Sequence, residues 1–489
     1  MGILAVYDAV GIQSYIFSSN KLSENVGASK LVADIFGETL RAAIMEVTKE
    51  VLPRWQDGKE LDTELSAEII YQGGGNAYVS FKNEDIFNAV TKKFLTNVSQ
   101  GAAGVGIAVA AIETDFGDTY KSDFDTLNKR LSLVKGGFNI PVFAGNQPIT
   151  KQSGRTGLPA SEFAENEYLS NSQKLKRDRY KRYKKEHDTG YGKEIEDFDD
   201  LIFGKGEDSL IAIVHADGNN MGSRIKSFME KFETYAEAAP KIRALSVKID
   251  ECYKQARERT ISLFKTEYPA DKPLPLIELI GDGDDTTLVI GGHFALDFTA
   301  RLLREIENTP EDLRPFSGDK PTACAGVVIF HSHYPFSEAY KLVEALCASA
   351  KKPSRDSEGS YLDFHLHQSG GVSELSVLRK RLYLVNGKSI LRRPWRVSDD
   401  SESEFPNFKW FEENTPIIKE IPRNKAKAIR NAIGAGDVAA KLAENQLRGE
   451  KLPKFPLACD NETSSYAHIF DILEISDIYE NLLNKGDAV

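Results

Sequence analysis

Short apolar runs divide the first part of the chain into a regular series of expected elements. The runs at 3–8 (ILAVYD) and 103–112 (AGVGIAVAAI) predict single strands, and the glycine-interrupted pair at 67–81 (AEIIYQGGGNAYVSF) predicts a hairpin. Apolar residues recur at spacings of three and four over 83–99 and again near 118–135, which predicts helices.

The same order returns in the middle of the chain. Runs at 210–217 (LIAIVHAD) and 325–332 (AGVVIFHS) predict strands, and the double run at 275–292 (PLIELIGDGDDTTLVIGG) predicts a second hairpin. Helical periodicity follows at 293–308 and near 336–352. Each first run is also followed by a loop and a helix-like stretch. Up to its last strand, each part therefore reads β-α-β-β-α-β.

The spacing of acids and turns indicates that the two parts are copies. Asp8 and Asn76 are 68 positions apart, and so are Asp217 and Asp285. A repeated β-α-β-β-α-β unit is typical of the ferredoxin-like palm domains of nucleotide cyclases and polymerases. We therefore expect an α+β protein with two palm domains and, after them, a helical domain.

The domain boundaries follow from this repeat and from changes of composition. A helical insertion is expected near 223–264 within the second palm, and helices near 422–445 and 468–485 in the tail. The expected segments are a first palm at 1–150, a charged linker at 151–207, a second palm at 208–370 and a C-terminal helical domain at 371–489.

The linker contains the basic stretch KLKRDRYKRYKKEH at 174–187. One interpretation is a solvated helix or loop. The other is a surface for RNA, with Arg and Lys on phosphates and Tyr180 and Tyr183 stacked on bases. The pattern alone leaves both open.

Composition narrows the class of protein. With 41% hydrophobic and 28% charged residues, the chain is expected to fold into two or three soluble domains. A net charge of −11 argues against a free-standing duplex-DNA binder. The four cysteines form no CxxC pair, and neither a signal peptide nor an 18-residue apolar run is present, so we expect a cytoplasmic protein without membrane association.

Three acids of the second copy are candidates for metal binding and catalysis: Asp217, Asp284 and Asp285. In a palm, the end of the first strand and the turn of the next hairpin are neighbours in the sheet. The three carboxylates should therefore converge. They would repel one another, and a bound cation would relieve that repulsion. Carboxylates suit Mg²⁺ or Mn²⁺, which nucleotidyl transfer uses in pairs. DG and GD are also ordinary turn dipeptides, but their joint occurrence at two strand ends favours a site.

Glycine-rich segments beside these acids are candidates for nucleotide binding. Glycines let the backbone approach a triphosphate, and successive N–H groups can then bind its oxygens. In the second copy the candidates are Gly218, Asn219, Asn220, Met221, Gly222 and Gly283; in the first they are Gly73, Gly74, Gly75 and Asn76. The first copy keeps Asp8 but has no acid in its hairpin, so we expect it to bind nucleotide without catalysing.

The motifs together resemble a known family. DAVGIQSYIF (8–17), YQGGGNAYVSF (71–81), HADGNNMG (215–222), GDGDD (281–285) and SAKK (349–352) are similar to the large polymerase/cyclase subunit of type III CRISPR effector complexes and its stand-alone relatives. The resemblance implies an enzyme that joins ATP by 3′–5′ linkages into cyclic oligoadenylates, with subunits of an RNA-guided complex and RNA as partners. It also implies that Asp217, Asp284 and Asp285 hold the metals and that Lys351 or Lys352 contacts a triphosphate.

Several features set the chain apart from the family pattern. Asp282 replaces the first glycine of the usual GGDD turn. No HD nuclease domain is expected, because the first palm pattern begins at the first residues. Without the resemblance, Lys351 and Lys352 would be expected at a solvated helix end. Two alternatives stay open: a cyclase that makes another cyclic di- or oligonucleotide, and a non-catalytic nucleotide-binding subunit.

Overall fold

The computed structural model describes most of the chain as two compact units. The described residues are 1–137, 150–186, 195–202, 209–270, 272–368, 371, 374–398, 407–447, 452–454 and 461–482. One unit comprises Met1–Asp197 and Asn220–Cys252, and the other comprises Phe198–Asn219 and Tyr253–Val489. We describe each unit by itself.

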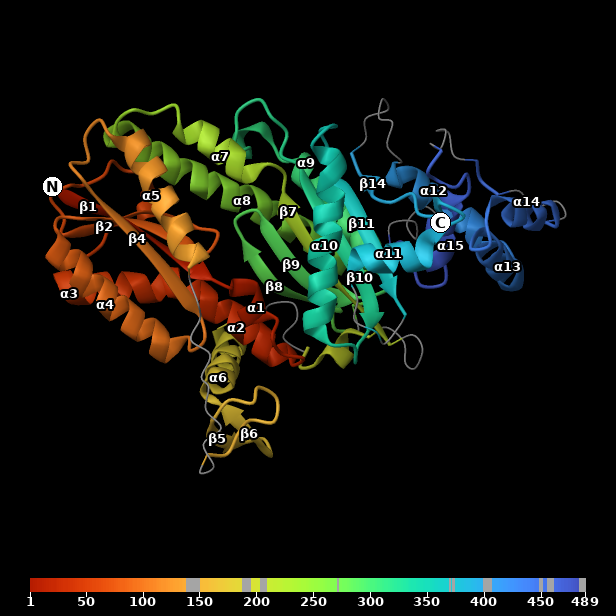
Figure 1. The fold of residues 1–489 in the computed structure, drawn as a ribbon, viewed down its shortest axis with the longest axis horizontal. Helices are drawn as coiled ribbons and strands as arrows, with labels where there is room; N and C mark the ends of the chain where they lie inside the picture. Colours follow the sequence, from red (N-terminus) through yellow and green to blue (C-terminus); the bar gives the residue numbers. More distant parts are fainter. Residues whose placement is uncertain are drawn as a thin grey trace. The chain divides into compact units, whose positions relative to one another are not determined.

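The first unit, whose sheet is coloured red to orange in Figure 1, is built on four antiparallel strands in the order β2-β3-β1-β4. This order is the one that a β-α-β-β-α-β repeat produces when its first strand lies in the centre. The strands are β1 (Gly2–Val10), β2 (Ala67–Gly73), β3 (Asn76–Phe81) and β4 (Gly106–Thr114). Its palm helices are α1 (Ile12–Ile16), α2 (Leu22–Asp34), α3 (Arg41–Thr48), α4 (Glu84–Gly101) and α5 (Tyr120–Gly136), with a π-helical segment (Ile35–Leu40) between α2 and α3.

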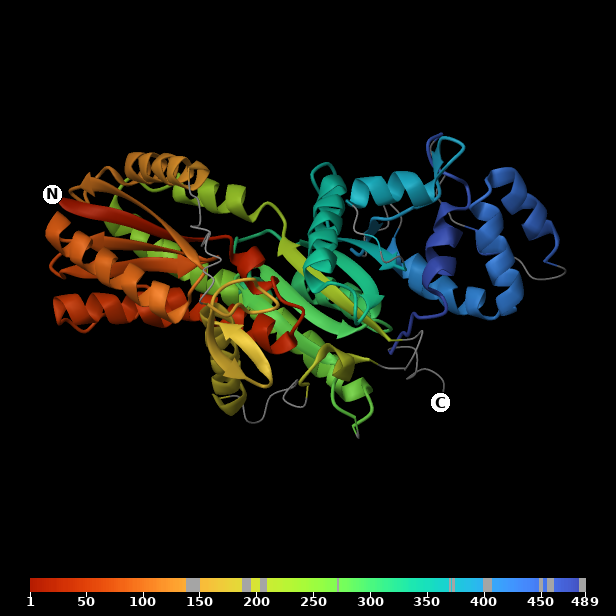
Figure 2. The same cartoon turned by 60° about the horizontal axis from the view of Figure 1, so that its bottom comes forward.

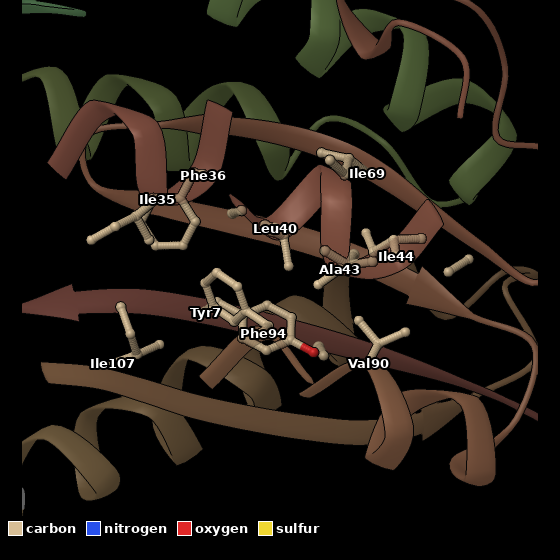
Figure 3. Close-up of a cluster of buried hydrophobic side chains, with 14 of the residues drawn as sticks. Tyr7, Ile35, Phe36, Leu40, Ala43, Ile44, Ile69, Val90, Phe94 and Ile107 are labelled. Atoms are coloured by element: carbon tan, nitrogen blue, oxygen red, sulfur yellow. The ribbon is translucent and has the colours of Figure 1, made fainter. Parts of the chain in front are cut away.

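Alternate residues of β1 point to opposite sides of the sheet, and those on each side pack into a buried hydrophobic cluster. Tyr7 packs on one side among residues of the π-helical segment, α3 and α4, and its ring meets Phe94 edge-on at 5.3 Å between centroids (Figure 3). The Tyr7 hydroxyl lies 2.7 Å from Thr91 Oγ1, which satisfies its polar end. Val6 packs on the other side with Phe124 of α5.

The basic stretch forms helix α6 (Asn171–Glu186), which follows the short hairpin of β5 (Ala160–Ala164) and β6 (Glu167–Ser170) (Figure 2). Arg177 is almost fully buried and pairs with Glu24 at 2.7 Å, and Arg179 pairs with Asp34 at 2.6 Å. Tyr180 is also buried and donates to the Ile195 carbonyl. Neither interpretation from the sequence describes these residues: they are intramolecular contacts of the first unit, so Tyr180 cannot stack on RNA in this conformation.

The second unit repeats the four-stranded sheet and extends it to six strands in the order β14-β11-β10-β7-β9-β8. The central strand β7 pairs antiparallel with β9 and β10, and β10 pairs parallel with β11. The strands are β7 (Leu210–Gly218), β8 (Leu276–Asp282), β9 (Asp285–Gly291), β10 (Ala323–His331), β11 (Tyr361–His367) and β14 (Trp395–Arg396). Its palm helices are α9 (Ala295–Glu307) and α10 (Phe336–Ser354).

The hairpins of the two sheets share one irregularity. Pairing with the neighbouring strand shifts between Ile69 and Tyr71 in β2, and between Glu278 and Ile280 in β8. Positions 69 and 278 differ by 209, which is also the difference between Asp8 and Asp217. Bulges re-aim the residues beyond them. The two palms are thus repeated in backbone detail, and the expected α+β fold with two palm domains is confirmed.

The remaining elements also follow the expected order. Helices α7 (Met221–Met229) and α8 (Tyr235–Glu267) form the insertion expected near 223–264. The tail is mainly helical, with a small hairpin of β12 (Leu384–Val385) and β13 (Lys388–Ser389). Its helices are α11 (Leu375–Tyr383), α12 (Phe408–Lys419), α13 (Arg423–Ile433), α14 (Asp437–Asn445) and α15 (Ala467–Ile475). The last part of the helix expected at 468–485 lies outside the described residues.

A buried ion pair joins the tail to the second sheet. Arg393 Nε lies 3.1 Å from Asp471 of α15, and its Nη1 donates to the Phe364 carbonyl of β11. Trp395 Nε1 donates to the same aspartate. Removing one partner of such a network leaves a buried charge unpaired, so the tail is an integral part of this unit. No helix in the described part of the chain is both long and apolar enough to cross a membrane.

Candidate active site

The candidate acids of the second sheet meet where β7 ends and the β8–β9 hairpin turns. The register pairs Ala216 with Thr286, so that one step further Asp217 comes opposite Asp285. In the first sheet the matching positions are Asp8 and Asn76, which pair directly. The sequence offset of 68 positions thus corresponds to a cross-strand pair in each sheet.

The hairpin turn places three acids close together. Gly283 has a φ of +57°, a conformation that side-chain-bearing residues seldom adopt. Asp282 pairs with Asp285 across this turn and is exposed, while Asp284 occupies the turn itself. Asp282 therefore sits at the position of the expected glycine without displacing the acid pair.

A histidine that we did not single out from the sequence completes the cluster. One ring nitrogen of His215 and one carboxylate oxygen from each of Asp217 and Asp285 lie within 4.8 Å of one another. Residues two apart on a strand share a face, and His215 precedes Asp217 by two. That period-two relationship was the signal in the sequence that could have found it.

The electrostatics of this group favour a bound cation. Burial, reinforced by repulsion from Asp217, raises the pKa of Asp284 to about 6. Burial, with repulsion from Asp217 and Asp284, raises the pKa of Asp285 to about 7. Burial lowers the pKa of His215 to about 4, so its imidazole is neutral and able to act as a ligand near pH 7. Two carboxylates and a neutral imidazole fit a divalent cation, which would relieve the repulsion between the acids.

Asp284 is not one of the three residues whose ligand atoms lie within 4.8 Å of one another, and it packs beside Gly218. A methyl group on Gly218 would come 2.8 Å from Asp284 Oδ2 and 2.6 Å from the Tyr253 hydroxyl of α8. Since no side chain fits there, glycine is required for Asp284 to approach the end of β7. The sequence predicted Asp217, Asp284 and Asp285 as one set. In the structure Asp217 and Asp285 group with His215, and Asp284 lies beside Gly218.

Lys351 of α10 forms an ion pair with Asp217 and lies 3.4 Å from the Gly218 carbonyl. Burial disfavours the charge of Lys351, but Asp217 holds its pKa above the usual value. The expectation of a solvated helix end is thus wrong for Lys351, whereas Lys352 is exposed. Helix α10 can lie this close because Gly326 of β10 has no side chain: a methyl group there would come 2.4 Å from the Val343 carbonyl.

The residues after Asp217 have differing environments. Asn219 is buried, and its amide donates to Thr322 Oγ1 at 3.0 Å and to the Gly359 carbonyl at 2.9 Å. These bonds give Asn219 a structural role in this conformation. Asn220 adopts a left-handed conformation before α7, and Met221 and Gly222 begin that helix. These three belong to the first unit, and their role in nucleotide binding stays a prediction.

The first palm carries a related but uncharged hairpin. Asp8 is buried and pairs with Lys135 of α5 at 2.9 Å. Gly74 and Gly75 turn the hairpin with φ of +59° and +77°, and the Gly75 carbonyl accepts a hydrogen bond from Ala9 N. Gly73 and Asn76 end the flanking strands, and the Asn76 side-chain oxygen is buried without a hydrogen-bond partner in the described structure. With one carboxylate already paired to lysine, this site is a poor cation site.

Comparison with known proteins identifies the domain that carries the candidate acids. Residues 210–358 match the family model of the second palm domain of Cas10/Cmr2. This match covers β7 to the approach to β11 and so includes His215, Asp217, Asp284, Asp285 and Lys351. No sequence among the curated proteins matches the chain.

Solved structures similar to the whole chain come from type III CRISPR proteins. A Csm1–Csm4 cassette in complex with cA4 matches with a TM-score of 0.58 and 14% identity, over 98% of this chain and 69% of that one. Csm1 of T. onnurineus matches with a TM-score of 0.54 and 13% identity, over 98% and 70%. A Csm1–Csm4 cassette in complex with one ATP gives a TM-score of 0.54 and 13% identity, over 97% and 69%. The expected resemblance to the palm-domain subunit of these effectors is confirmed.

Proposed function

We propose that this protein is a nucleotidyltransferase that converts ATP into cyclic oligoadenylates for CRISPR-type antiviral defence. The observation that carries the proposal is the convergence of Asp217 and Asp285, with His215, at the end of β7 within a Cas10/Cmr2-type second palm domain. Asp284, immediately beside them, supplies a further carboxylate whose ionisation burial opposes.

The residues of this site suit phosphodiester formation. In that reaction the 3′-oxygen of one nucleotide forms a bond to the α-phosphorus of another ATP, the bond from that phosphorus to the bridging oxygen breaks, and pyrophosphate leaves. The hydroxyl proton passes to solvent. Divalent cations, Mg²⁺ or Mn²⁺, would lower the pKa of the hydroxyl and neutralise the departing charge. Asp217, Asp284 and Asp285 would hold them.

Two other features would serve binding of the triphosphate. The ammonium group of Lys351 lies at Asp217 and is placed to pair with a phosphate once a cation neutralises that aspartate. Gly218 would offer its peptide groups to the triphosphate, while Asp284 and the Tyr253 hydroxyl occupy the space where a side chain would lie. We assign Gly222 and Gly283 the same role.

Ligands of the similar structures support adenine nucleotides as substrates and products. Csm1–Csm4 cassettes have been solved with one ATP, with pppApA and with cA4. By analogy we infer that this chain assembles with further subunits of an RNA-guided complex, that RNA regulates it and that it acts in the cytoplasm. The first palm, with Asp8 paired to Lys135, would bind nucleotide through Gly73, Gly74, Gly75 and Asn76 without catalysing.

The test is synthesis by the purified full chain. We expect ATP with Mg²⁺ or Mn²⁺, alone or with added RNA, to give cyclic 3′–5′ adenylates identifiable by mass spectrometry. The double variant Asp284→Ala/Asp285→Ala should give none, and Asp8→Ala should retain synthesis. Cyclic products from another nucleotide would replace the assigned substrate, and no product under any condition would favour a nucleotide-binding subunit without catalysis.

A further inference from the structure

His215 lies beside the acids that carry the proposed function, but that function assigns it no role of its own. We propose that His215 is a nitrogen ligand of the cation held by Asp217 and Asp285, and that it makes this site prefer Mn²⁺ to Mg²⁺. This inference rests on the metal site assigned under the proposed function, and it names the cation which that site selects.

The sheet aims His215 at the same point as the two acids. His215 and Asp217 share one face of β7 because they are two residues apart. Across the ladder His215 pairs with Thr287, two residue pairs before Asp217 comes opposite Asp285. The three potential ligand atoms consequently lie within 4.8 Å of one another, although they come from two strands more than 60 residues apart in sequence.

Contacts around the ring fix its orientation. His215 Nδ1 lies 2.9 Å from the Thr287 hydroxyl, and the ring meets that of Tyr340 at 6.2 Å between centroids. In the described residues no second hydrogen bond reaches the ring, so its other nitrogen is available to a ligand. A histidine that binds a metal commonly uses its second nitrogen in this way, for a hydrogen bond that orients the ring.

Burial argues against a role for His215 in solvent or at an interface. Its side chain is 7% exposed, at the point where β7 lies under α10. A histidine serving only as core packing would not need to face two carboxylates. Its position beside Asp217 and Asp285 gives the ring a ligand role that an apolar residue of similar size could not fill.

The donor set determines the choice of cation. Mg²⁺ takes oxygen ligands in near-ideal octahedral geometry and parts with its water reluctantly, whereas imidazole suits first-row transition metals. Mn²⁺ accepts both carboxylate and imidazole. One nitrogen beside two carboxylates should therefore raise the affinity for Mn²⁺ relative to that for Mg²⁺, compared with a site made of oxygen alone.

The experiment measures binding rather than synthesis. Mn²⁺ is titrated into the metal-free full chain and followed by electron paramagnetic resonance, and Mg²⁺ is added in competition. We expect pulsed spectra of bound Mn²⁺ to show coupling to an imidazole ¹⁴N in the wild type and none in His215→Asn. The variant should also lose at least about 10-fold in Mn²⁺ affinity, the lower end of the effect of losing a residue that only supports a ligand, with a much smaller change for Mg²⁺.

Controls separate the ligand from the fold. His331→Asn alters an exposed histidine at the opposite end of β10 and should keep both the ¹⁴N coupling and the affinity. Thr287→Val removes the orienting hydroxyl and should weaken Mn²⁺ binding while keeping the coupling. Circular dichroism and thermal melting of each variant check that it folds.

The outcomes for the ligand and for the proposed metal site are distinguishable. Mn²⁺ that binds the wild type without ¹⁴N coupling, or an unchanged ratio of Mn²⁺ to Mg²⁺ affinity in His215→Asn, would overturn the role of His215 and leave the carboxylate site intact. The metal site, and this inference with it, would be overturned if the wild-type protein bound neither cation. The same would follow if Asp285→Asn bound both cations as tightly as the wild type does.

Discussion

Lys135 pairs with Asp8 at 2.9 Å in the first palm, and Lys351 makes the corresponding pair with Asp217 in the second. In each case the acid ends the first strand of the sheet and the lysine comes from the palm's last helix, α5 or α10. The charge pair is therefore part of the repeated unit. The palms differ in the hairpin partner of the acid, which is Asn76 in one and Asp285 in the other.

Lys351 should compete with a cation for Asp217. Replacing it by methionine, Lys351→Met, keeps most of the side-chain volume but removes the positive charge. We expect Mn²⁺ and Mg²⁺ to bind several-fold more tightly, because a like charge beside the site is lost. Synthesis should nevertheless fall by about 10-fold or more, since one charge-assisted contact to the triphosphate is lost.

Lys352→Met is the matched control, because Lys352 is the exposed neighbour on the same helix. Calorimetric titration with each cation and an initial-rate assay on ATP measure the two effects. Cation affinity that falls in Lys351→Met would show that the lysine supports the site rather than competing for it.

Asp284 and Asp285 should differ in metal binding although both are needed for synthesis. Only Asp285 lies in the three-residue group with His215 and Asp217. Loss of a residue that only hydrogen-bonds a metal ligand commonly lowers metal affinity by about 10–100-fold. Asp285 would be a ligand itself, so we expect Asp285→Asn to weaken Mn²⁺ binding by at least about 100-fold. Asp284→Asn should retain most of that affinity, and Asp282→Asn, in the same turn, serves as control. Equal losses in Asp284→Asn and Asp285→Asn would contradict this division.

Two glycines near the site should tolerate alanine differently. Gly218→Ala puts a methyl group 2.6 Å from the Tyr253 hydroxyl and 2.8 Å from Asp284 Oδ2, so we expect a loss of about 1–3 kcal/mol in the free energy of unfolding. Gly222 has open space around it and lies in α7, so Gly222→Ala should be neutral or slightly stabilising. Denaturant titrations give both values. If Gly222→Ala folds normally yet loses synthesis, substrate binding requires that position 222 carry no side chain.

The repeat was predictable from the sequence because its signals are local. Apolar runs, turn glycines and the equal spacing of Asp8–Asn76 and Asp217–Asp285 all follow from the period of strands and the chemistry of turns. Convergence of Asp217 and Asp285 followed from the palm topology alone.

What the sequence did not reveal depends on contacts between distant elements. His215 precedes Asp217 in an apolar run, and only the pairing of β7 with β9 sets it beside Asp285. Arg177 and Tyr180 belong to a stretch that looks solvated, and their partners Glu24 and Ile195 lie elsewhere in the sequence. The pairs of Asp8 and Asp217 with their lysines likewise span more than 120 positions.

Repulsion within the acid cluster should appear as an unusual dependence of stability on pH. The pKa of Asp284 is raised to about 6 and that of Asp285 to about 7, from the usual 3.8 of an aspartate. Between about pH 4 and pH 7 the folded, metal-free protein therefore holds protons that the unfolded chain has released. The contribution of these groups to stability is thus largest at low pH, falls as the pH rises through this window and stays low above it.

Replacing both acids by amides should remove this fall in stability at higher pH. With metal chelated, we expect Asp284→Asn/Asp285→Asn to melt at least about 2 °C above the wild type near pH 8, and close to it near pH 4. Excess Mn²⁺ should raise the wild-type melting temperature near pH 8 much more than near pH 5, because the cation competes with protons for Asp285, and it should hardly affect the double variant. Asp282→Asn, which alters an exposed acid of the same turn, should leave the pH dependence almost unchanged. A difference between wild type and double variant that is constant from pH 4 to pH 8 would mean that the two carboxylates titrate normally, and the electrostatic basis for a bound cation would be lost.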